Sequence, residues 1–143
     1  MRKVYVDSSI LIPLLFENHE EHPDVEIIFK GFANDSTILI LISTLTIDEV
    51  WHILRSYSDV LDKPYGVFSE KFRITIINFL NNPNIKIIDT VDGVASLKIA
   101  LEGSIKFNLK PRDSFHYAYA KLWNAEIVAK DRDFMYTDLT VAS

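Results

Sequence analysis

Four acidic side chains stand where apolar segments end or helices begin: Asp7, Glu49, Asp113 and Asp131. Asp7 ends the first apolar run, and Glu49 and Asp113 lie in the first turns of predicted helices. Asp131 follows a later apolar run, and Asp133 comes two residues after it. Carboxylates brought close together repel one another unless a cation joins them. Their hard oxygen atoms suit Mg²⁺ or Mn²⁺, and such ions activate water for attack on a phosphodiester. The acids therefore indicate metal-dependent hydrolysis.

Each of these acids also has a purely structural interpretation. Thr46 and Glu49 have the spacing of a capping box, in which Thr46 begins a helix and Glu49 reaches back to its first N–H group. Asp113 is favourable at the positive end of a helix dipole, and Asp131 is a common residue type in turns. Asp7 is harder to explain in this way, because it closes a strand that we expect to be buried.

Other kinds of site find less support. The chain has no cysteine, which excludes a thiolate zinc site and a cysteine nucleophile. Its four glycines form neither a Walker loop nor a dinucleotide fingerprint. His52 and His116 each follow an acid by three residues, and we favour a packed or capping role over contact with metal or substrate. The histidines of segment 19–22 lack the spacing of zinc proteases, so that segment is predicted to be a solvated loop.

Basic residues flank the third and fourth acids: Lys110, Arg112, Lys130 and Arg132. They are candidate contacts for RNA phosphates, although exposed basic side chains need no such explanation. The net charge is −5, with an isoelectric point near 5.3, which argues against a protein that coats nucleic acid through phosphate contacts alone. Divalent cations reverse the sign of an acidic pocket, so the charge is compatible with an enzyme that meets phosphate through bound metal.

Short apolar runs and helical patterns alternate along the chain. Strands are expected at 3–7, 37–43, 85–89, 126–129 and 139–142. Helices are expected around 9–16, 24–32, 47–54, 65–81, 92–105 and 111–123. The run from Thr37 to Ser43 is apolar on both faces, which is typical of a parallel strand covered by helices on both sides. The pattern predicts a wound α/β sheet, whose ligands bind beyond the carboxyl ends of the strands.

The chain is expected to form a single domain over residues 1–143, since no repeat or linker divides it. No apolar segment is long enough for a membrane span, and Asp7 interrupts the only run near the N-terminus, unlike a signal peptide. We therefore expect a cytoplasmic protein without membrane contact.

Four segments taken together resemble the PIN domain, and in particular the toxin ribonucleases of VapBC-type toxin–antitoxin pairs. They read VYVDSS at 4–9, TIDEV at 46–50, LKPRDSFH at 109–116 and IVAKDRDF at 127–134. The resemblance covers essentially the whole chain. It implies a five-stranded parallel sheet in the order 3-2-1-4-5 with helices on both faces, which would put Asp7 next to Asp131.

The resemblance also implies roles for particular residues. The four acids of the family fall on Asp7, Glu49, Asp113 and Asp131. Asp133 matches a less regular acidic position, and Ser8 matches the small hydroxyl residue that follows the first acid. Many members carry Thr or Ser two residues before the fourth acid, where this chain has Ala129. A hydroxyl outside the direct ligands is therefore missing there, which would weaken one metal position.

The function that follows is a metal-dependent endoribonuclease, the toxin of a toxin–antitoxin pair, with Mg²⁺ or Mn²⁺ as cofactor and RNA as substrate. The resemblance implies a homodimer and a small antitoxin that covers the acidic cleft, with an arginine paired to the carboxylates. The alternative is a catalytically weak or inactive PIN-like module that binds RNA or protein. A phosphotransfer enzyme with Asp7 as nucleophile is weaker, because Ser9 stands where such enzymes often carry a second aspartate.

Overall fold

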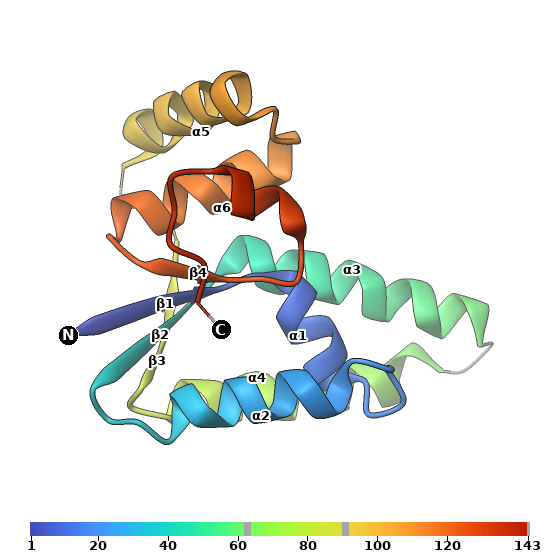
Figure 1. Cartoon of the computed structure of the whole chain (residues 1–143). Coiled ribbons are helices and arrows are strands. Elements are labelled where there is room, and N and C mark those ends of the chain that lie inside the picture. Colours follow the sequence, from blue (N-terminus) through green and yellow to red (C-terminus); the bar gives the residue numbers. More distant parts are fainter. Residues whose placement is uncertain (62–63, 90–91, 143) are drawn as a thin grey trace.

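The sheet of this computed structural model, which describes residues 1–61, 64–89 and 92–142, is parallel throughout. Its four strands lie in the order β3-β2-β1-β4. They are β1 (Arg2–Val6), β2 (Ile38–Ser43), β3 (Ile85–Ile88) and β4 (Glu126–Val128). The order brings β4, near the end of the chain, beside β1 at its beginning (Figure 1). The predicted parallel α/β sheet is therefore confirmed.

The fifth predicted strand, at 139–142, is reduced to one isolated bridge between Ile127 and Val141. Two backbone hydrogen bonds hold it, from Ile127 N to Thr140 O at 2.9 Å and from Ala142 N to Ile127 O at 2.8 Å. The chain bends at 137–139 after a 3-10 helix, η1 (Arg132–Tyr136), so the first residue of the predicted strand lies in the bend. The short stretch that remains makes one bridge to β4 and does not extend the ladder.

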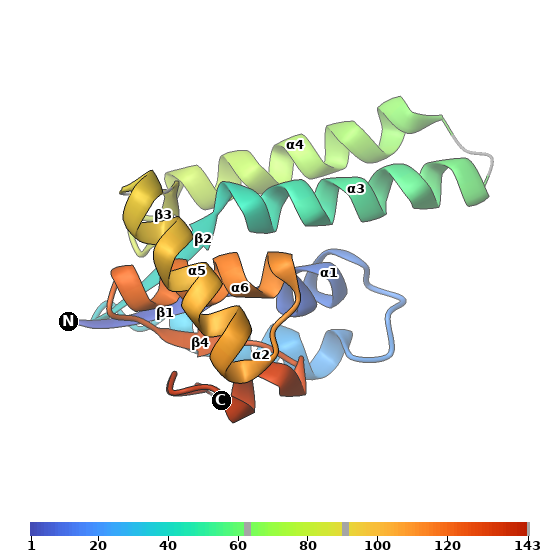
Figure 2. The same ribbon diagram turned by 90° about the horizontal axis from the view of Figure 1, so that it is seen from above.

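Helices cover both faces of the sheet (Figure 1). In chain order they are α1 (Ser8–Leu15), α2 (His22–Ala33), α3 (Thr44–Val60), α4 (Tyr65–Asn81), α5 (Gly93–Phe107) and α6 (Pro111–Leu122). The predicted helices are all present, with ends shifted by a few residues. Helices α3 and α4 pack as an antiparallel pair that extends beyond the sheet (Figure 2). Within the described ranges, no helix combines the length and apolar character needed to cross a membrane.

The period-2 alternation of the strands divides the core into two parts. Val4 and Val6 of β1 pack with side chains of α1 to α4, in the same cluster as Ile40 of β2. Tyr5 points to the other face and packs with α6 and η1, in the same cluster as Leu41. The last three residues of β1, Val4, Tyr5 and Val6, are thus buried on both faces of the sheet, which explains why they show no alternation of apolar and polar residues.

Helices α5 and α6 meet at a glycine. Asn108 ends α5 in the left-handed conformation, with φ of 55°, and Pro111 begins α6, where its missing N–H has no helical partner to lose. After this short connection, α5 and α6 pack closely against each other. A Cβ atom at Gly103 would lie 2.6 Å from the ring of Tyr117, so Gly103 allows the ring of α6 to lie against α5.

We expect Gly103→Ala to lower the free energy of unfolding by about 1–3 kcal/mol, because the added methyl group overpacks this contact. Urea denaturation of the purified variant measures the change. Gly31→Ala is the matched control, because nothing lies within 4 Å of its added Cβ in α2 and alanine favours a helix by up to about 1 kcal/mol. Equal stabilities for the two variants would contradict the close α5–α6 contact.

Candidate active site

Asp7 lies at the carboxyl end of β1 and begins α1. Its Oδ2 atom accepts hydrogen bonds from the backbone N of Ser9 at 3.2 Å and from Ser9 Oγ at 2.8 Å. Its own N–H group donates to Val128 O of the neighbouring strand at 3.1 Å. The side chain is 6% exposed. The carboxylate is therefore held in one orientation, with Oδ1 directed away from the helix it caps.

Glu49 lies in α3, and its carboxylate contacts another helix rather than the N-terminal end of its own. The N-cap of α3 is Ser43, whose Oγ atom accepts from Thr46 N at 3.1 Å. Thr46 lies inside the helix and donates to Val6 O at 3.2 Å, so the capping box that the sequence suggested does not form. The Glu49 carboxylate is instead hydrogen-bonded to Nε2 of His116. A long-range partner has replaced the local one.

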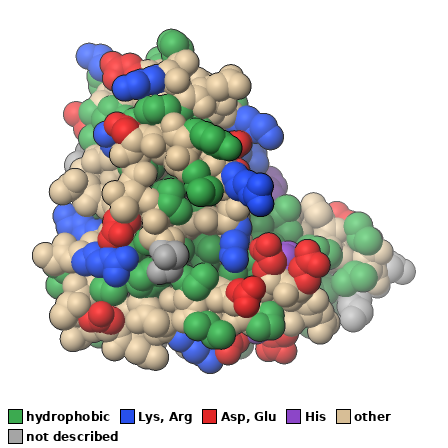
Figure 3. All heavy atoms as spheres, in the orientation of Figure 1, with side chains coloured by type: hydrophobic (Ala, Val, Ile, Leu, Met, Phe, Trp, Pro, Cys, Tyr) green, Lys and Arg blue, Asp and Glu red, His purple; other side chains and the backbone are tan. Residues whose placement is uncertain are grey.

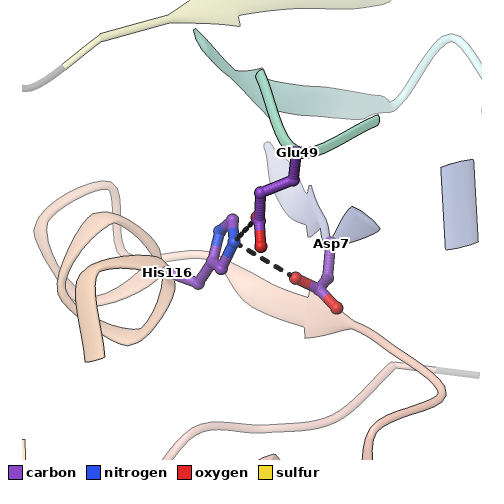
Figure 4. A group of neighbouring side chains, drawn as sticks. All are labelled: Asp7, Glu49 and His116. Carbon is purple, nitrogen blue, oxygen red and sulfur yellow. Dashed lines mark hydrogen bonds and ion pairs between the residues drawn. The ribbon is translucent and has the colours of Figure 1, made fainter. Parts of the chain in front are cut away.

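His116 joins two of the four predicted acids (Figure 4). The residue is fully buried in α6, and its Nε2 atom lies 3.4 Å from Oδ1 of Asp7 as well as against Glu49. The packed role that the sequence favours agrees with its burial, and the histidine also contacts the acidic site. Its place one helical turn after Asp113, on the same face of α6, is the sequence signal that pointed to this contact.

Asp113, Asp131 and Asp133 form a second group, whose carboxylate oxygens lie within 4.8 Å of one another. Asp113 lies in the first turn of α6. Asp131 begins η1 and accepts a hydrogen bond from Asp133 N at 2.9 Å. Asp113 and Asp131 are half-buried, whereas Asp133 is exposed. The loop after β4 and the start of α6 therefore deliver these carboxylates to a common point.

The two groups share one electrostatic field. Partial burial raises the pKa of Asp113 to about 6, and the negative charges of Asp131, Asp7 and Glu49 add to the shift. Burial alone would lower the pKa of His116. Its hydrogen bond to Glu49 and the charges of Asp7, Glu49 and Asp113 outweigh that effect and raise its pKa. The pKa of Asp113 is thus raised by the charges of the other three predicted acids, which links the two groups.

Ser9 connects the first acid to the loop that carries the fourth. Its hydroxyl donates to Asp7 Oδ2 and accepts from Lys130 N at 2.9 Å. The hydroxyl that contacts Asp7 is therefore that of Ser9, and the role of Ser8, which directly follows Asp7, stays a prediction. Ala129 leaves no hydroxyl on the side of β4, but Ser9 makes the corresponding link from α1.

The basic residues that flank the acids are all exposed: Lys110, Arg112, Lys130 and Arg132. Lysine and arginine side chains lie close to a group of acidic ones on the face in Figure 3. Among the described residues, neither Asp7 nor Glu49 forms an ion pair with a lysine or arginine, and the nitrogen in contact with both carboxylates is Nε2 of His116. The exposed basic groups are thus free to meet a polyanion around the site.

The donor set fits a divalent metal ion. Asp7, Glu49 and His116 each offer one ligand atom, and these atoms lie within 4.8 Å of one another. The group formed by Asp113, Asp131 and Asp133 has the same spread and offers oxygen alone. Carboxylate oxygens suit Mg²⁺ and Mn²⁺, and a cation would offset the repulsion among these half-buried charges.

Comparison with known proteins gives a family and a set of similar folds. The family model described as PIN domain matches residues 4–138. No curated protein sequence matches the chain. Among solved structures, the VapC20 toxin of Mycobacterium tuberculosis, described as cleaving the sarcin-ricin loop, has a TM-score of 0.71 at 13% identity and covers 96% of each chain.

Two further structures come from toxin–antitoxin complexes. VapBC2 from Rickettsia felis, bound to a DNA fragment from its promoter, has a TM-score of 0.70 at 14% identity and covers 98% of this chain and 97% of its own. A toxin–antitoxin complex from Klebsiella pneumoniae has a TM-score of 0.67 at 18% identity, with coverage of 98% and 96%. At such identities these structures show a shared fold.

We expect Ser9→Ala to lower the free energy of unfolding of the metal-free protein by about 1–3 kcal/mol. The change removes a hydrogen bond to a carboxylate and leaves Lys130 N without its acceptor. Ser8→Ala, the same substitution one residue earlier, should change stability by less than about 0.5 kcal/mol. Urea denaturation measures both variants, and an equal loss in both would contradict the specific link through Ser9.

Asp113→Asn should stabilise the metal-free protein at neutral pH. The folded protein holds the Asp113 proton up to about pH 6, whereas the ordinary value is 3.8. The ionised carboxylate therefore destabilises the folded state as pH rises through this range. We expect the variant to gain about 1–2 kcal/mol at pH 7, after allowance for solvent screening, and nothing below about pH 3.8.

Thermal unfolding across pH 3 to 8 measures the difference from the unsubstituted protein. Asp48→Asn removes an exposed carboxylate of α3 and should shift stability by less than about 0.5 kcal/mol at any pH. A gain for Asp113→Asn that does not vary with pH would show that charge repulsion is not its cause.

Proposed function

Since this chain belongs to the PIN domain family, we propose that it is a metal-dependent endoribonuclease that hydrolyses RNA phosphodiester bonds. The observation that carries the proposal is the meeting of four carboxylates, from separate parts of the chain, at the carboxyl ends of parallel strands. These are Asp7, Glu49, Asp113 and Asp131. This is the edge where wound α/β sheets bind their ligands.

The chain's own residues divide the work of the site. Asp7 and Asp131 are the main ligands in this proposal, because the first is fixed by Ser9 and the second lies on the adjoining loop. A bound Mg²⁺ or Mn²⁺ supplies activation of water and stabilisation of the leaving oxygen. Asp113, in the first turn of α6, completes the site or positions the attacking water in this proposal. Glu49 completes the donor set.

The exposed basic residues position the substrate in this proposal. Lys110 and Arg112 lie at the start of α6, and Lys130 and Arg132 lie on either side of Asp131. Phosphate contacts from such side chains fix the register of a nucleic acid without reading its sequence. RNA would therefore be held along the rim while one phosphate reaches the carboxylates.

We further propose that the enzyme is the toxin of a toxin–antitoxin pair. The similar folds from Rickettsia felis and Klebsiella pneumoniae were solved as toxin–antitoxin complexes, which supports an antitoxin partner. A cavity of about 430 Å³ lies between the end of α1 and the α3–α4 pair, and its lining includes Phe16, Leu54 and Phe72. Leu54, which lines this cavity, lies in the same helix, α3, as Glu49. An antitoxin segment could therefore bury apolar side chains there and direct an arginine to the acids.

Cleavage of a mixed RNA pool by the purified protein tests the enzyme. We expect cutting with Mg²⁺ or Mn²⁺ and none with EDTA. Asp7→Asn keeps the helix cap but removes a charged ligand, and the rate should fall more than about 100-fold, beyond the range typical of groups outside the direct ligands. Asp48→Asn, an exposed carboxylate next to Glu49 in the sequence, should cut at the unsubstituted rate.

Equal cutting by Asp7→Asn would point to a contaminating nuclease and contradict the proposal. RNA that is retained in a gel shift but not cut with either metal, and retained equally by Asp7→Asn, would favour the binding module over the enzyme. Either result separates catalysis at the carboxylates from RNA binding elsewhere on the surface.

A further inference from the structure

A chain of buried hydroxyl groups leads from the backbone of β1 to His116. The Thr46 hydroxyl donates to Val6 O at 3.2 Å, and the Ser43 hydroxyl donates to Thr46 Oγ1 at 3.2 Å. The Tyr5 hydroxyl lies 2.6 Å from Ser43 Oγ and 2.6 Å from Nδ1 of His116. Apart from the backbone carbonyl at one end, every member of the chain is a buried side chain.

The Val6 carbonyl oxygen can only accept a hydrogen bond, so it sets the donor-to-acceptor direction of the whole series of hydrogen bonds. Thr46 must donate to it, so Ser43 donates to Thr46 and Tyr5 donates to Ser43. The oxygen of Tyr5 is then left to accept from His116. This is the assignment in which every one of these contacts is a hydrogen bond, and it places a proton on Nδ1 of His116.

With the proton of the neutral imidazole on Nδ1, the other ring nitrogen, Nε2, carries a lone pair. In the neutral ring, the lone pair of Nε2 would face Oδ1 of Asp7 and Oε1 of Glu49. A lone pair and two carboxylates in a buried site need a cation among them, either a proton or a metal ion. Histidines that bind metal through one nitrogen commonly donate the other N–H group to an acceptor that fixes the ring, and Tyr5 is that acceptor here.

We propose that Nε2 of His116 is a direct ligand of the ion that Asp7 and Glu49 hold, and that this inner position prefers Mn²⁺ to Mg²⁺. The inference rests on the proposed metal dependence of the enzyme. Imidazole nitrogen binds transition-metal ions, whereas Mg²⁺ keeps to oxygen ligands and water. The outer group of Asp113, Asp131 and Asp133 offers oxygen alone, so the preference arises from the inner position.

Pulsed electron paramagnetic resonance of Mn²⁺ added to the metal-free full chain tests the inference directly. Protein labelled with ¹⁵N only in its histidines should show a nitrogen coupling to the bound Mn²⁺. The coupling should vanish in His116→Gln, with Mn²⁺ affinity lower by more than about tenfold and a smaller change for Mg²⁺. His52→Gln, an exposed histidine of α3, should keep the coupling.

Tyr5→Phe distinguishes the proposed metal ligand, His116, from the tyrosine hydroxyl that orients its ring. It removes the acceptor of the Nδ1 proton and keeps the imidazole, so the nitrogen coupling should persist while Mn²⁺ affinity falls. The unsubstituted protein alone can decide the question if His116→Gln does not fold. Bound Mn²⁺ without histidine coupling overturns the proposal, whatever the variants do.

The outcomes distinguish this inference from the proposed function. Metal-dependent RNA cleavage together with bound Mn²⁺ that lacks histidine coupling would leave the ribonuclease in place and remove His116 from the ligands. A coupling that survives in His116→Gln would do the same. Failure to bind Mn²⁺ at all, with no cleavage in any metal, would overturn both.

Discussion

The carboxylates at one edge of the parallel sheet repel one another. Much of the surrounding structure offsets this repulsion. Asp7 is nearly buried, yet no lysine or arginine among the described residues pairs with it. The groups that contact the Asp7 carboxylate are instead the backbone N–H and the hydroxyl of Ser9 and the imidazole of His116. Each contact orients a carboxylate and leaves oxygen atoms available. A lysine paired with these oxygen atoms would occupy the position that a divalent ion needs.

The strand β1 links the framework to the chemistry because both of its faces are buried. Its valines fasten the sheet to α1 to α4, while Tyr5 faces α6 and binds His116. Asp7 follows directly, at the point where the chain turns into α1. Packing and site geometry are therefore not separable here, since a shift of β1 relative to α6 would move Tyr5, His116 and Asp7 together.

Local sequence patterns predicted the positions of the helices and strands well. They predicted less well which residues these helices and strands contact. The alternation of apolar runs and helical spacing located the four paired strands and the helices, because periodicity reflects burial of one face or both. The segment at 139–142 has the composition of a strand, but only Val141 pairs with the sheet. The spacing of Thr46 and Glu49 matched a local cap, whereas Glu49 found a partner in α6. Local spacing carries no information about a competing long-range partner.

The sequence by itself determined the fold class, the order of the strands through the family resemblance, and the acids of the candidate site. These follow from residue types and their order along the chain, which are local properties. The tertiary structure decided how the acids divide into an inner group with His116 and an outer group of oxygen ligands. It also decided that the Ser9 hydroxyl joins Asp7 to the loop of Asp131. Such choices depend on which side chains meet when β1, α3 and α6 pack, and distances between segments far apart in the chain exist only once the sheet has formed.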